Sequence, residues 1–229
     1  MKIVTFSFDD CEIHDRRLAM LLRQYGMKAT FFLISGQLGL SVPFHRYGED
    51  TTVERVTAEE IPITYRGMEV ASHTQFHQLP LEATRLREEM TASLQTLSDA
   101  CGYRVCGMAY PGGQYVETQT EALRQMRLMY ARGASPTHTL SVPCDYLRWQ
   151  PSCHYADEHL PALIHRFLQE EGDLLLHIFG HSYELTQRDS RKNWCAFEET
   201  LKVLAGRDDI QYCTNAETVM HFTKGLSDR

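Results

Sequence analysis

Two adjacent carboxylates, Asp9 and Asp10, directly follow an apolar run from Lys2 to Phe8. The run is rich in β-branched and aromatic residues, which predicts a buried strand. Two carboxylates at the exit of such a strand are costly unless a cation meets them. A helix N-cap, the ordinary role of Asp at such a place, needs only one of them. The pair therefore indicates that one carboxylate binds a metal ion while the other remains a general base.

Two histidines four residues apart, His73 and His77, offer the nitrogen ligands that such a site needs. On one helical turn they would share a face and bind one divalent ion, with a carboxylate from elsewhere as the third ligand. Thr74 stands where a thermolysin-type protease has its glutamate, so that class is excluded. In a chain with 11 histidines the spacing by itself is equally well explained by two surface histidines. Its combination with Asp9 and Asp10 favours the metal site.

The composition is that of a soluble globular protein, with 43% hydrophobic and 23% charged residues. A length of 229 residues fits one α/β barrel, so we expect a single domain over 1–229. No apolar stretch approaches the length that spans a bilayer, which predicts no membrane segment. The formal net charge of -7 argues against nucleic acid as a partner, because such partners select basic surfaces.

The cysteines and the first residues bear on the cellular location. The seven cysteines form no CxxC pair and no spacing typical of a disulfide framework. Only Met1 and Lys2 precede the first strand, so no signal-peptide region is expected. These features predict a reduced, cytoplasmic setting.

Strand and helix patterns alternate along the chain. Strands are predicted at 2–8, 28–34, 68–72, 105–110, 129–132, 173–179 and 210–213. Helices are predicted at 15–25, 58–65, 81–101, 118–128, 157–169, 194–204 and 216–222. Two stretches lack a regular pattern: 36–60, expected as an insertion over one mouth of the fold, and 133–155, expected as a long loop.

Seven such units without a nucleotide-binding loop favour a closed parallel barrel over an open sheet. The positions of the polar residues agree with a barrel, because barrel active sites are built past the carboxyl ends of the strands. Five candidate site residues lie at such ends: Asp9, Asp10, His73, Pro111 and His181.

With these residues in view, the chain resembles the polysaccharide deacetylases of the NodB-homology type, which are metal-dependent carbohydrate esterases. Their first motif, T-F-D-D, is similar to Ser7-Phe8-Asp9-Asp10, and their second, H-[ST]-x-x-H, is matched by His73-Thr74-Gln75-Phe76-His77. The resemblance implies a distorted (β/α)7 TIM-like barrel. It also implies Asp9 as the catalytic base, and Asp10, His73 and His77 as the metal ligands.

The third family motif, R-x-P-Y-G, is similar to Ala109-Tyr110-Pro111-Gly112-Gly113, with two departures. Ala109 replaces the arginine that steadies the base in relatives, and Gly112 replaces an aromatic residue whose backbone N–H helps to hold the oxyanion. The N–H remains available after the second change. By resemblance, Tyr110, Pro111 and Gly112 form the oxyanion and substrate pocket. Arg148 or Arg132 would supply the missing charge from another loop, unless both are ordinary surface arginines.

The fourth and fifth motifs are matched less closely. Asp145-Tyr-Leu-Arg-Trp149 is similar to D-x-x-x-W, in which the Asp orients the acid and the Trp lines the sugar pocket, although a buried Trp is often plain packing. The fifth motif, L-x-L-H, has two candidates, His177 and His181, and we favour His181 as the general acid because His177 would lie inside a strand. The stretch Gly180-His-Ser-Tyr-Glu184, followed by Trp194, resembles a small branch of the family that lacks the third-motif arginine.

The resemblance implies hydrolysis of an amide in an N-acetylated sugar, with release of acetate. One divalent metal ion is expected, zinc by default, although iron, cobalt or nickel suit the same ligands. Two alternatives stay open: hydrolysis of a small non-polymeric N-acyl metabolite, or a catalytically weakened barrel that binds glycan, which the Ala109 departure suggests. The sequence sets neither the acyl group nor the oligomeric state.

Overall fold

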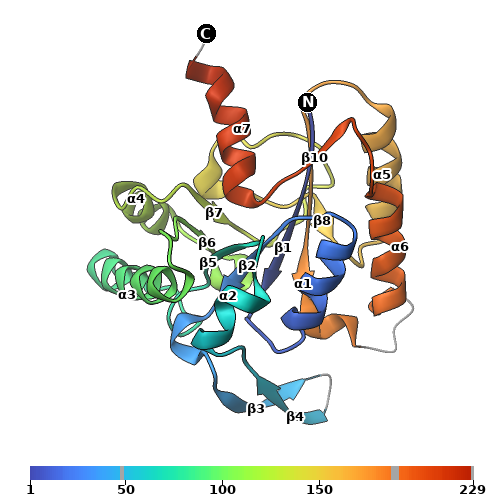
Figure 1. The fold of residues 1–229 in the computed structure, drawn as a ribbon. Coiled ribbons are helices and arrows are strands. Elements are labelled where there is room, and N and C mark those ends of the chain that lie inside the picture. The colour runs from blue at the N-terminus through green and yellow to red at the C-terminus, as the bar shows by residue number, and fades with distance from the viewer. Residues whose placement is uncertain (47–48, 187–190, 228–229) are drawn as a thin grey trace.

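Strand β1 (Lys2–Asp9) is the centre of the parallel sheet in the computed structural model, which describes residues 1–46, 49–186 and 191–227. It pairs along its whole length with β9 (Leu174–His181). On its other side it pairs with β10 (Ile210–Tyr212) near its start and with β2 (Ala29–Leu33) near its end. The strand predicted at the start of the chain is thus the one around which the sheet is arranged (Figure 1).

The sheet closes on itself. From β2 it continues through β5 (Glu69–Ser72) and β6 (Gly107–Ala109) to β7 (Tyr130–Arg132), and beyond β9 it continues to β8 (Cys153–His154). Trp149, shortly before β8, forms a parallel bridge with Arg132 at the end of β7. The Gly133 N–H also donates to the Trp149 carbonyl oxygen at 2.8 Å. The predicted fold class, an α/β protein with a distorted (β/α)7 TIM-like barrel, is confirmed.

One strand of the ring is not where the sequence predicts it. The segment predicted at 210–213 becomes β10, which pairs only with the first half of β1 and lies off the path of the ring. The seventh place is filled by 149–154, within the stretch 133–155 predicted as a loop. That segment contains only 2 strand residues and includes Pro151, so it shows no strand pattern.

Helices cover the outside of the barrel, with α1, α5 and α6 on one side and α3 and α4 on the other (Figure 1). The longest, α3, ends at Gly102, whose φ of 74° is the left-handed conformation that stops a helix. The helices are α1 (Asp15–Gln24), α2 (Ile61–Thr64), α3 (Ala83–Cys101), α4 (Glu117–Gln125), α5 (Leu160–Gln169), α6 (Trp194–Leu204) and α7 (Asn215–Ser227). Short 3-10 turns lie at Ser35–Gln37, Ala58–Glu60, Pro111–Gly113, Tyr146–Arg148 and Ser182–Leu185. None of the helices in the described part of the chain is long and apolar enough to cross a membrane.

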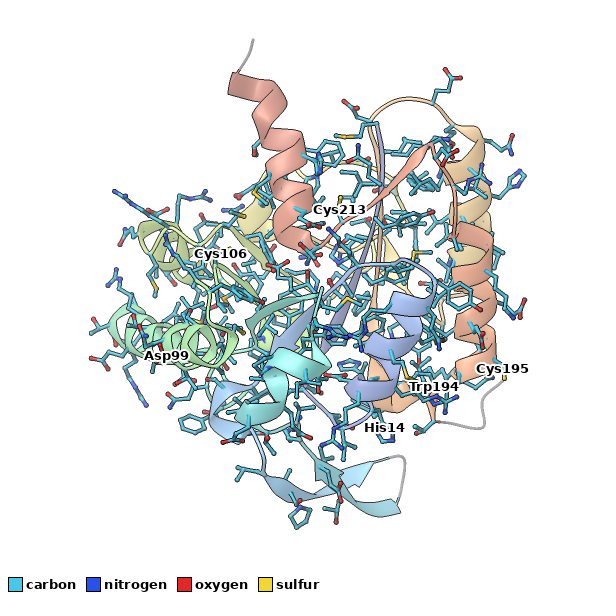
Figure 2. The ribbon with its side chains drawn as sticks, viewed as in Figure 1. His14, Asp99, Cys106, Trp194, Cys195 and Cys213 are labelled. Carbon is cyan, nitrogen blue, oxygen red and sulfur yellow. The ribbon has the colours of Figure 1, made fainter. Side chains whose placement is uncertain are left out.

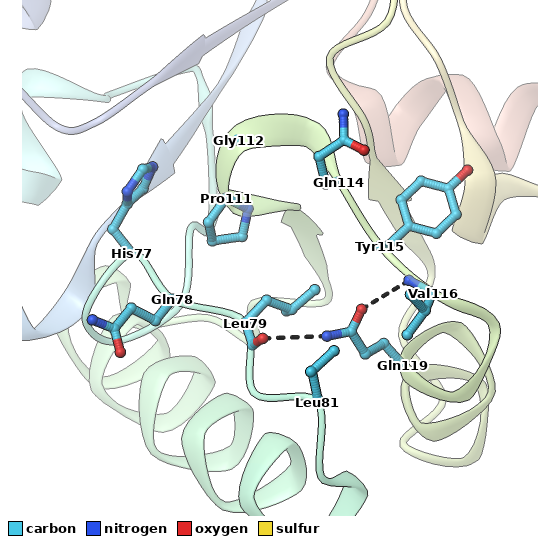
Figure 3. Close-up of a pocket in the computed structure, with 10 residues that line it drawn as sticks. All are labelled: His77, Gln78, Leu79, Leu81, Pro111, Gly112, Gln114, Tyr115, Val116 and Gln119. Atoms are coloured by element: carbon cyan, nitrogen blue, oxygen red, sulfur yellow. Dashed lines mark hydrogen bonds between the residues drawn. The ribbon is translucent and has the colours of Figure 1, made fainter.

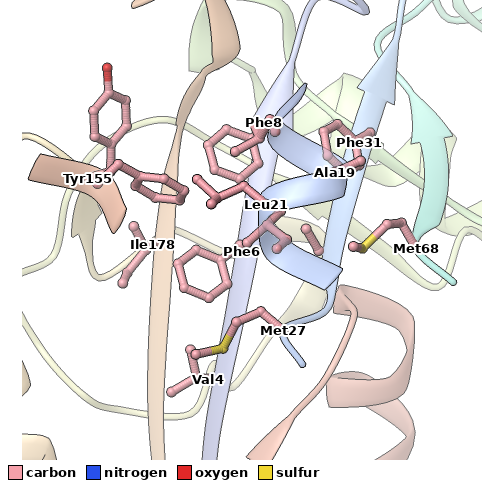
Figure 4. Close-up of a cluster of buried hydrophobic side chains, with 14 of the residues drawn as sticks. Val4, Phe6, Phe8, Ala19, Leu21, Met27, Phe31, Met68, Tyr155 and Ile178 are labelled. Carbon is pink, nitrogen blue, oxygen red and sulfur yellow. The ribbon is translucent and has the colours of Figure 1, made fainter. Parts of the chain in front are cut away.

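Alternate side chains of β1 face opposite ways, as a strand requires. Val4, Phe6 and Phe8 face the outer helices (Figure 4), and Phe6 and Phe8 meet the ring of Phe197 edge-on at 6.1 and 5.8 Å between centroids. The buried aromatic pairs anchor α6 to the strand.

The alternate residues Thr5, Ser7 and Asp9 face the barrel interior, where hydrogen bonds satisfy their polar side chains. Thr5 Oγ1 donates to Asn215 Oδ1 at 2.9 Å, and the Asn215 side-chain amide donates to Ser7 Oγ at 3.1 Å. Asn215 is the first residue of α7, so this helix closes the end of the barrel opposite the exit of β1. Asp9 is thereby left at the open mouth.

The insertion predicted at 36–60 forms an antiparallel hairpin of β3 (Ser41–Arg46) and β4 (Glu49–Glu54). It projects from the end of the molecule opposite the two chain termini, next to the exit of β1 (Figure 1). Its base is tied to the loop after β1, because the Ile13 N–H donates to the Glu54 carbonyl at 3.0 Å and the Val56 N–H to the Cys11 carbonyl at 2.9 Å. The hairpin therefore flanks the mouth at which Asp9 and Asp10 lie.

The cysteines are spread over the fold, as Figure 2 shows for Cys106, Cys195 and Cys213. All seven belong to the described residues and are free thiols. This matches the absence of a disulfide pattern in the sequence.

Candidate active site

The carboxyl ends of β1, β5, β7 and β9 meet around one cavity of about 690 Å³. Parallel strands bring their carboxyl ends to the same mouth, so residues far apart in sequence become neighbours there. The lining residues are Asp9, Asp10, Ile34, Gln37, Val42, Arg55, His73, Phe76, His77, Gln78, Gly112, Gly113, Ala134, Phe179, His181 and Tyr183. Five of the predicted catalytic and metal-binding residues are among them.

Asp10, His73 and His77 form a candidate set of metal ligands. The Nε2 atoms of His73 and His77 each lie 3.8 Å from Asp10 Oδ1, and the ligand atoms of all three residues lie within 4.8 Å of one another. His73 Nδ1 lies 3.0 Å from the Ala109 carbonyl oxygen, so Nδ1 carries the proton and the Nε2 lone pair faces Asp10. Two imidazole nitrogens and one carboxylate, with open positions beside them, fit a zinc-type divalent ion.

The backbone that carries these ligands is not the helical turn that the H-x-x-x-H spacing suggested. Residues 73–77 form an irregular turn directly after β5, with φ angles of 65° at Thr74 and 57° at His77. The Glu89 carboxylate of α3 accepts from the backbone N–H groups of Gln75 and Phe76 at 2.9 and 3.2 Å, which holds the turn in place. Asp10 also has a positive φ, 82°. Such backbone conformations are unfavourable for these residue types and persist where surrounding contacts enforce them.

Arg132 supplies the positive charge beside Asp9. Its side chain is fully buried, and Nη2 donates a hydrogen bond to Asp9 Oδ1 while Nη1 donates to the Gly133 carbonyl at 3.0 Å. Burial by itself raises the pKa of Asp9, but the charge of Arg132 and its hydrogen bond, with the charge of His181, hold that pKa below its usual value. Asp9 therefore stays ionised.

The register of the sheet explains how this arginine reaches the base. Arg132 of β7 lies directly opposite Ala109 of β6, the position at which the motif resemblance implies an arginine. A neighbouring strand thus provides the guanidinium that Ala109 lacks. Arg148, the other candidate, is exposed and pairs with Glu117 and with Asp145, away from the cavity.

His181 ends β9, where it lies beside Asp9 of the neighbouring strand β1. Its Nε2 lies 4.0 Å from Asp10 Oδ2, and its Nδ1 lies 3.4 Å from Glu184 Oε2, which also accepts from the His181 backbone N–H at 3.1 Å. Burial lowers the pKa of His181, but the hydrogen bond to Glu184 and the charges of Asp9 and Asp10 raise it to about 9. At neutral pH the imidazole is protonated.

His154 completes this arrangement from β8. The Ala156 N–H donates to His154 Nδ1 at 3.1 Å, so the proton of this imidazole is on Nε2, which donates to Glu184 Oε2 at 2.8 Å. Lys192 Nζ lies 3.7 Å from the other carboxylate oxygen of Glu184. Sequence reasoning gave Glu184 no role and overlooked His154. The position of Glu184 three residues after His181 was the available signal, whereas nothing in the loop-like stretch around His154 indicated its role.

His177, the alternative to His181, lies inside the barrel below the cavity. It is buried, with Nε2 at 2.6 Å from Ser7 Oγ and its ring against Trp149. Burial lowers its pKa well below the usual value, and the charge of Arg132 lowers it further. His177 is thus a neutral imidazole within the packed interior, whereas His181 lines the cavity.

The third-motif residues divide between two places. Gly112 lines the cavity with a φ of 64°, a conformation that glycine adopts freely. Pro111 lines an adjoining pocket together with Gly112 and His77, so the two hollows share a wall (Figure 3). Tyr110 lies beneath, with its hydroxyl donating to the Leu147 carbonyl at 2.8 Å and its ring stacked on Tyr115.

Asp145 and Trp149 do not reach the cavity, which corrects the substrate-pocket assignment made from the fourth motif. Asp145 caps the turn at Tyr146–Arg148 and pairs with Arg124 at 2.9 Å. Trp149 is buried among interior aromatic rings, where a large apolar side chain is most stable. The carboxylate that contacts His181 belongs to Glu184.

Comparisons with known proteins agree with this geometry. A family model described as polysaccharide deacetylase matches residues 1–131, while no curated protein matches the sequence. Among solved structures, a polysaccharide deacetylase homologue from Mycobacterium smegmatis superposes with a TM-score of 0.67 at 14% identity, covering 98% of this chain and 91% of that one.

Two further structures show the same architecture. An acetyl xylan esterase from Clostridium thermocellum, solved with a cobalt ion, gives a TM-score of 0.59 at 16% identity, covering 96% of this chain and 91% of that one. A mutant of the peptidoglycan deacetylase PdaC from Bacillus subtilis gives a TM-score of 0.55 at 18% identity, covering 100% of this chain and 96% of that one. At these identities the likeness concerns the fold.

Proposed function

The chain belongs to the polysaccharide deacetylase family, and we propose that it is a metal-dependent hydrolase that removes the acetyl group from an N-acetylated sugar and releases acetate. The observation that carries this proposal is the meeting of two groups in one cavity. The ligand set of Asp10, His73 and His77 lies beside the ion pair of Asp9 and Arg132. The first group suits a divalent cation, and the second keeps a carboxylate ready to accept a proton.

We propose zinc as the bound ion, held by Asp10, His73 and His77, with iron, cobalt or nickel as compatible substitutes. When bound, it would polarise the acetyl carbonyl and lower the pKa of a water molecule. The cobalt ion in the related acetyl xylan esterase supports a transition metal of this class.

Asp9 is the proposed base. Arg132 engages Oδ1, whereas Oδ2 faces the ligand set, 3.9 Å from His73 Nε2. Oδ2 is thus the oxygen placed to take the proton of the attacking water. The Gly112 backbone N–H, at the edge of the cavity, is the proposed donor to the oxyanion.

His181 is the proposed acid, which protonates the leaving amine. Its ring is fixed by Glu184, and Glu184 is fixed by His154 and by the backbone of His181. This arrangement sets the tautomer and orientation of the acid, as carboxylate–histidine pairs do in other hydrolases.

A specific observation favours a second candidate substrate, a small N-acyl metabolite with a negative charge. Arg55, at the base of the hairpin, lines the cavity and donates to the Asp10 carbonyl oxygen, and Val42 of β3 lines the same side. Arg55 adds positive charge to the cavity and Val42 adds apolar surface, which suits a compact anionic molecule better than a long neutral polymer. The cytoplasmic location predicted from the sequence accords with such a substrate and stays a prediction.

An acetate-release assay tests the proposal. The zinc-loaded protein is incubated with N-acetylglucosamine oligomers and with neutral and anionic N-acetyl metabolites. We expect turnover of at least one class, and its loss in Asp9→Asn with zinc still bound. Release from the oligomers supports the sugar deacetylase, and release only from anionic metabolites supports the second candidate. Undiminished turnover by Asp9→Asn would remove Asp9 from its role, and zinc-loaded protein that binds the oligomers but hydrolyses none of the panel would indicate a glycan-binding barrel.

A further inference from the structure

A second group of two histidines and one aspartate meets on the flank of the barrel. His138 lies in the connection after β7, and Asp157 and His159 lie in the turn before α5. The ligand atoms of these three residues lie within 4.8 Å of one another, and none of the three lines the active-site cavity. We infer that His138, Asp157 and His159 form a second site for a divalent transition-metal ion, with a structural role.

The geometry centres on the Asp157 carboxylate. His138 Nε2 lies 2.8 Å from Oδ2, and His159 Nδ1 lies 2.8 Å from Oδ1. The two imidazole rings stack with their centroids 4.2 Å apart and an angle of 29° between their planes. Each ring therefore presents one nitrogen to the same small volume beside the carboxylate.

Backbone contacts hold both sides of this group in place. The His138 N–H donates to the Ser152 carbonyl at 2.9 Å, and His138 has a φ of 53°, unusual for a residue other than glycine. Asp157 Oδ1 accepts from the His159 N–H at 2.8 Å, and the Asp157 N–H donates to the His154 carbonyl at 3.0 Å. The ligand positions are thus set by the main chain before any ion binds, which lowers the cost of binding.

The donor set and the exposure both suit a cation. Two imidazole nitrogens and a carboxylate oxygen are the same ligand types as in the active site, and zinc prefers them. The side chains of His138 and His159 are 40% and 53% exposed, which leaves room for water as a further ligand.

An ion here would link two segments of the chain that lie next to the wall of the active site. The connection from β7 to β8 carries the segment that closes the barrel, and the turn at Asp157 follows directly on β8 and His154. His154 in turn holds Glu184 beside His181. An ion that links His138 to Asp157 would therefore stiffen the wall from which the acid is oriented. It would also stabilise the fold by an amount that grows with the logarithm of the free ion concentration.

Zinc stoichiometry tests the inference. Protein stripped with a chelator is dialysed against micromolar free zinc, and bound zinc is measured by elemental analysis. We expect two ions per chain in the unmodified protein, one in His138→Asn/His159→Gln, and two in the matched control His165→Ala, which removes an exposed histidine of α5. Asparagine at 138 tolerates the positive φ, so the variant keeps the local backbone. One ion in the unmodified protein, or two in the double variant, would overturn the inference.

A thermal measurement separates loss of the ion from loss of the fold. In His77→Ala, which lacks a ligand of the active site, zinc should still raise the Tm with rising concentration. Adding His138→Asn/His159→Gln to that background should abolish the rise. A rise that persists in the triple variant, or one that needs millimolar zinc in His77→Ala, would show only adventitious binding and would contradict the second site.

Discussion

The active site combines two groups of residues, a metal side and a support side, which differ in how the fold brings them together. On the metal side, formed by Asp9, Asp10, His73 and His77, every residue lies within a short motif at the end of a strand or just after it. The support side, formed by Arg132, Glu184 and His154, is not part of the cavity lining, and each of its residues acts through a partner on another element. The residues of the metal side could accordingly be predicted from their spacing in the sequence. The residues of the support side could be assigned only once the register of the sheet was known. Changes to Asp10, His73 or His77 should remove both the ion and turnover, while changes to Asp9 or to the support side should affect turnover and leave the ion bound.

The largest effect is expected from His77→Ala, on the metal side. This ligand is 43% exposed, so its removal should leave the fold intact while the active-site ion is lost. We expect kcat/KM for acetate release to fall by about 10³-fold or more, the scale expected when a metal-assisted hydrolase loses its ion. Paired zinc analysis and kinetics check this, with His165→Ala as the control. Full turnover without the ion would contradict the claim that the metal side holds an ion needed for catalysis.

A smaller and pH-dependent effect is expected from Glu184→Gln, on the support side. Burial lowers the pKa of His181, and the hydrogen bond to Glu184 with the charges of Asp9 and Asp10 raises it to about 9. An acid must be protonated to act, so activity falls as pH rises past that pKa. Without the Glu184 charge, the alkaline limb of the kcat/KM profile should move to lower pH by about one unit.

The matched control for Glu184→Gln is Glu199→Gln, which neutralises an exposed carboxylate on α6. Its profile should coincide with that of the unmodified protein. Zinc content should be unchanged in both variants, because neither residue belongs to the ligand set. An alkaline limb that stays in place in Glu184→Gln would show that His181 is not the titrating acid.

The smallest effect is expected from Asp145→Asn. Asp145 pairs with Arg124 and Arg148 at the surface, and asparagine can still cap the turn at Tyr146–Arg148. Loss of such exposed pairs should cost about 0.5 kcal/mol or less in the free energy of unfolding. Urea unfolding and acetate release check this. A large loss of turnover would restore the fourth-motif role that the structure withdraws from Asp145.

The difference between the metal side and the support side also explains which features could be predicted from the sequence. The strand at 2–8 and the apolar face of α3 were predictable because hydrophobic periodicity is a local property of the sequence. Asp9 and Asp10 were predictable as site residues because a buried strand ends beside them. The seventh barrel strand was not, since 149–154 has two strand residues held by neighbours on both sides. Arg132 was one of two open alternatives, because its approach to Asp9 depends on its pairing with Ala109 across strands.

The turn at 73–77 shows a further limit. The H-x-x-x-H spacing was interpreted as a helical turn, yet the ligands converge through a left-handed backbone at Thr74 and His77. The contacts that enforce this backbone come from Glu89 of α3, more than ten residues later in the chain. Spacing identified the ligands correctly as neighbours, but the conformation that joins them is a tertiary effect.

The central claim is that Arg132, delivered by β7 beside Ala109, supports Asp9 as the base. The most direct measurement is kcat/KM for acetate release by zinc-loaded Arg132→Met, with zinc content recorded and Arg148→Met as the matched control. Removal of the buried partner should leave Asp9 unpaired, and we expect a loss on the order of 10²-fold with the ion still bound, while Arg148→Met stays near full activity. Equal activity in Arg132→Met and the unmodified protein, or an equal loss in Arg148→Met, would contradict the claim.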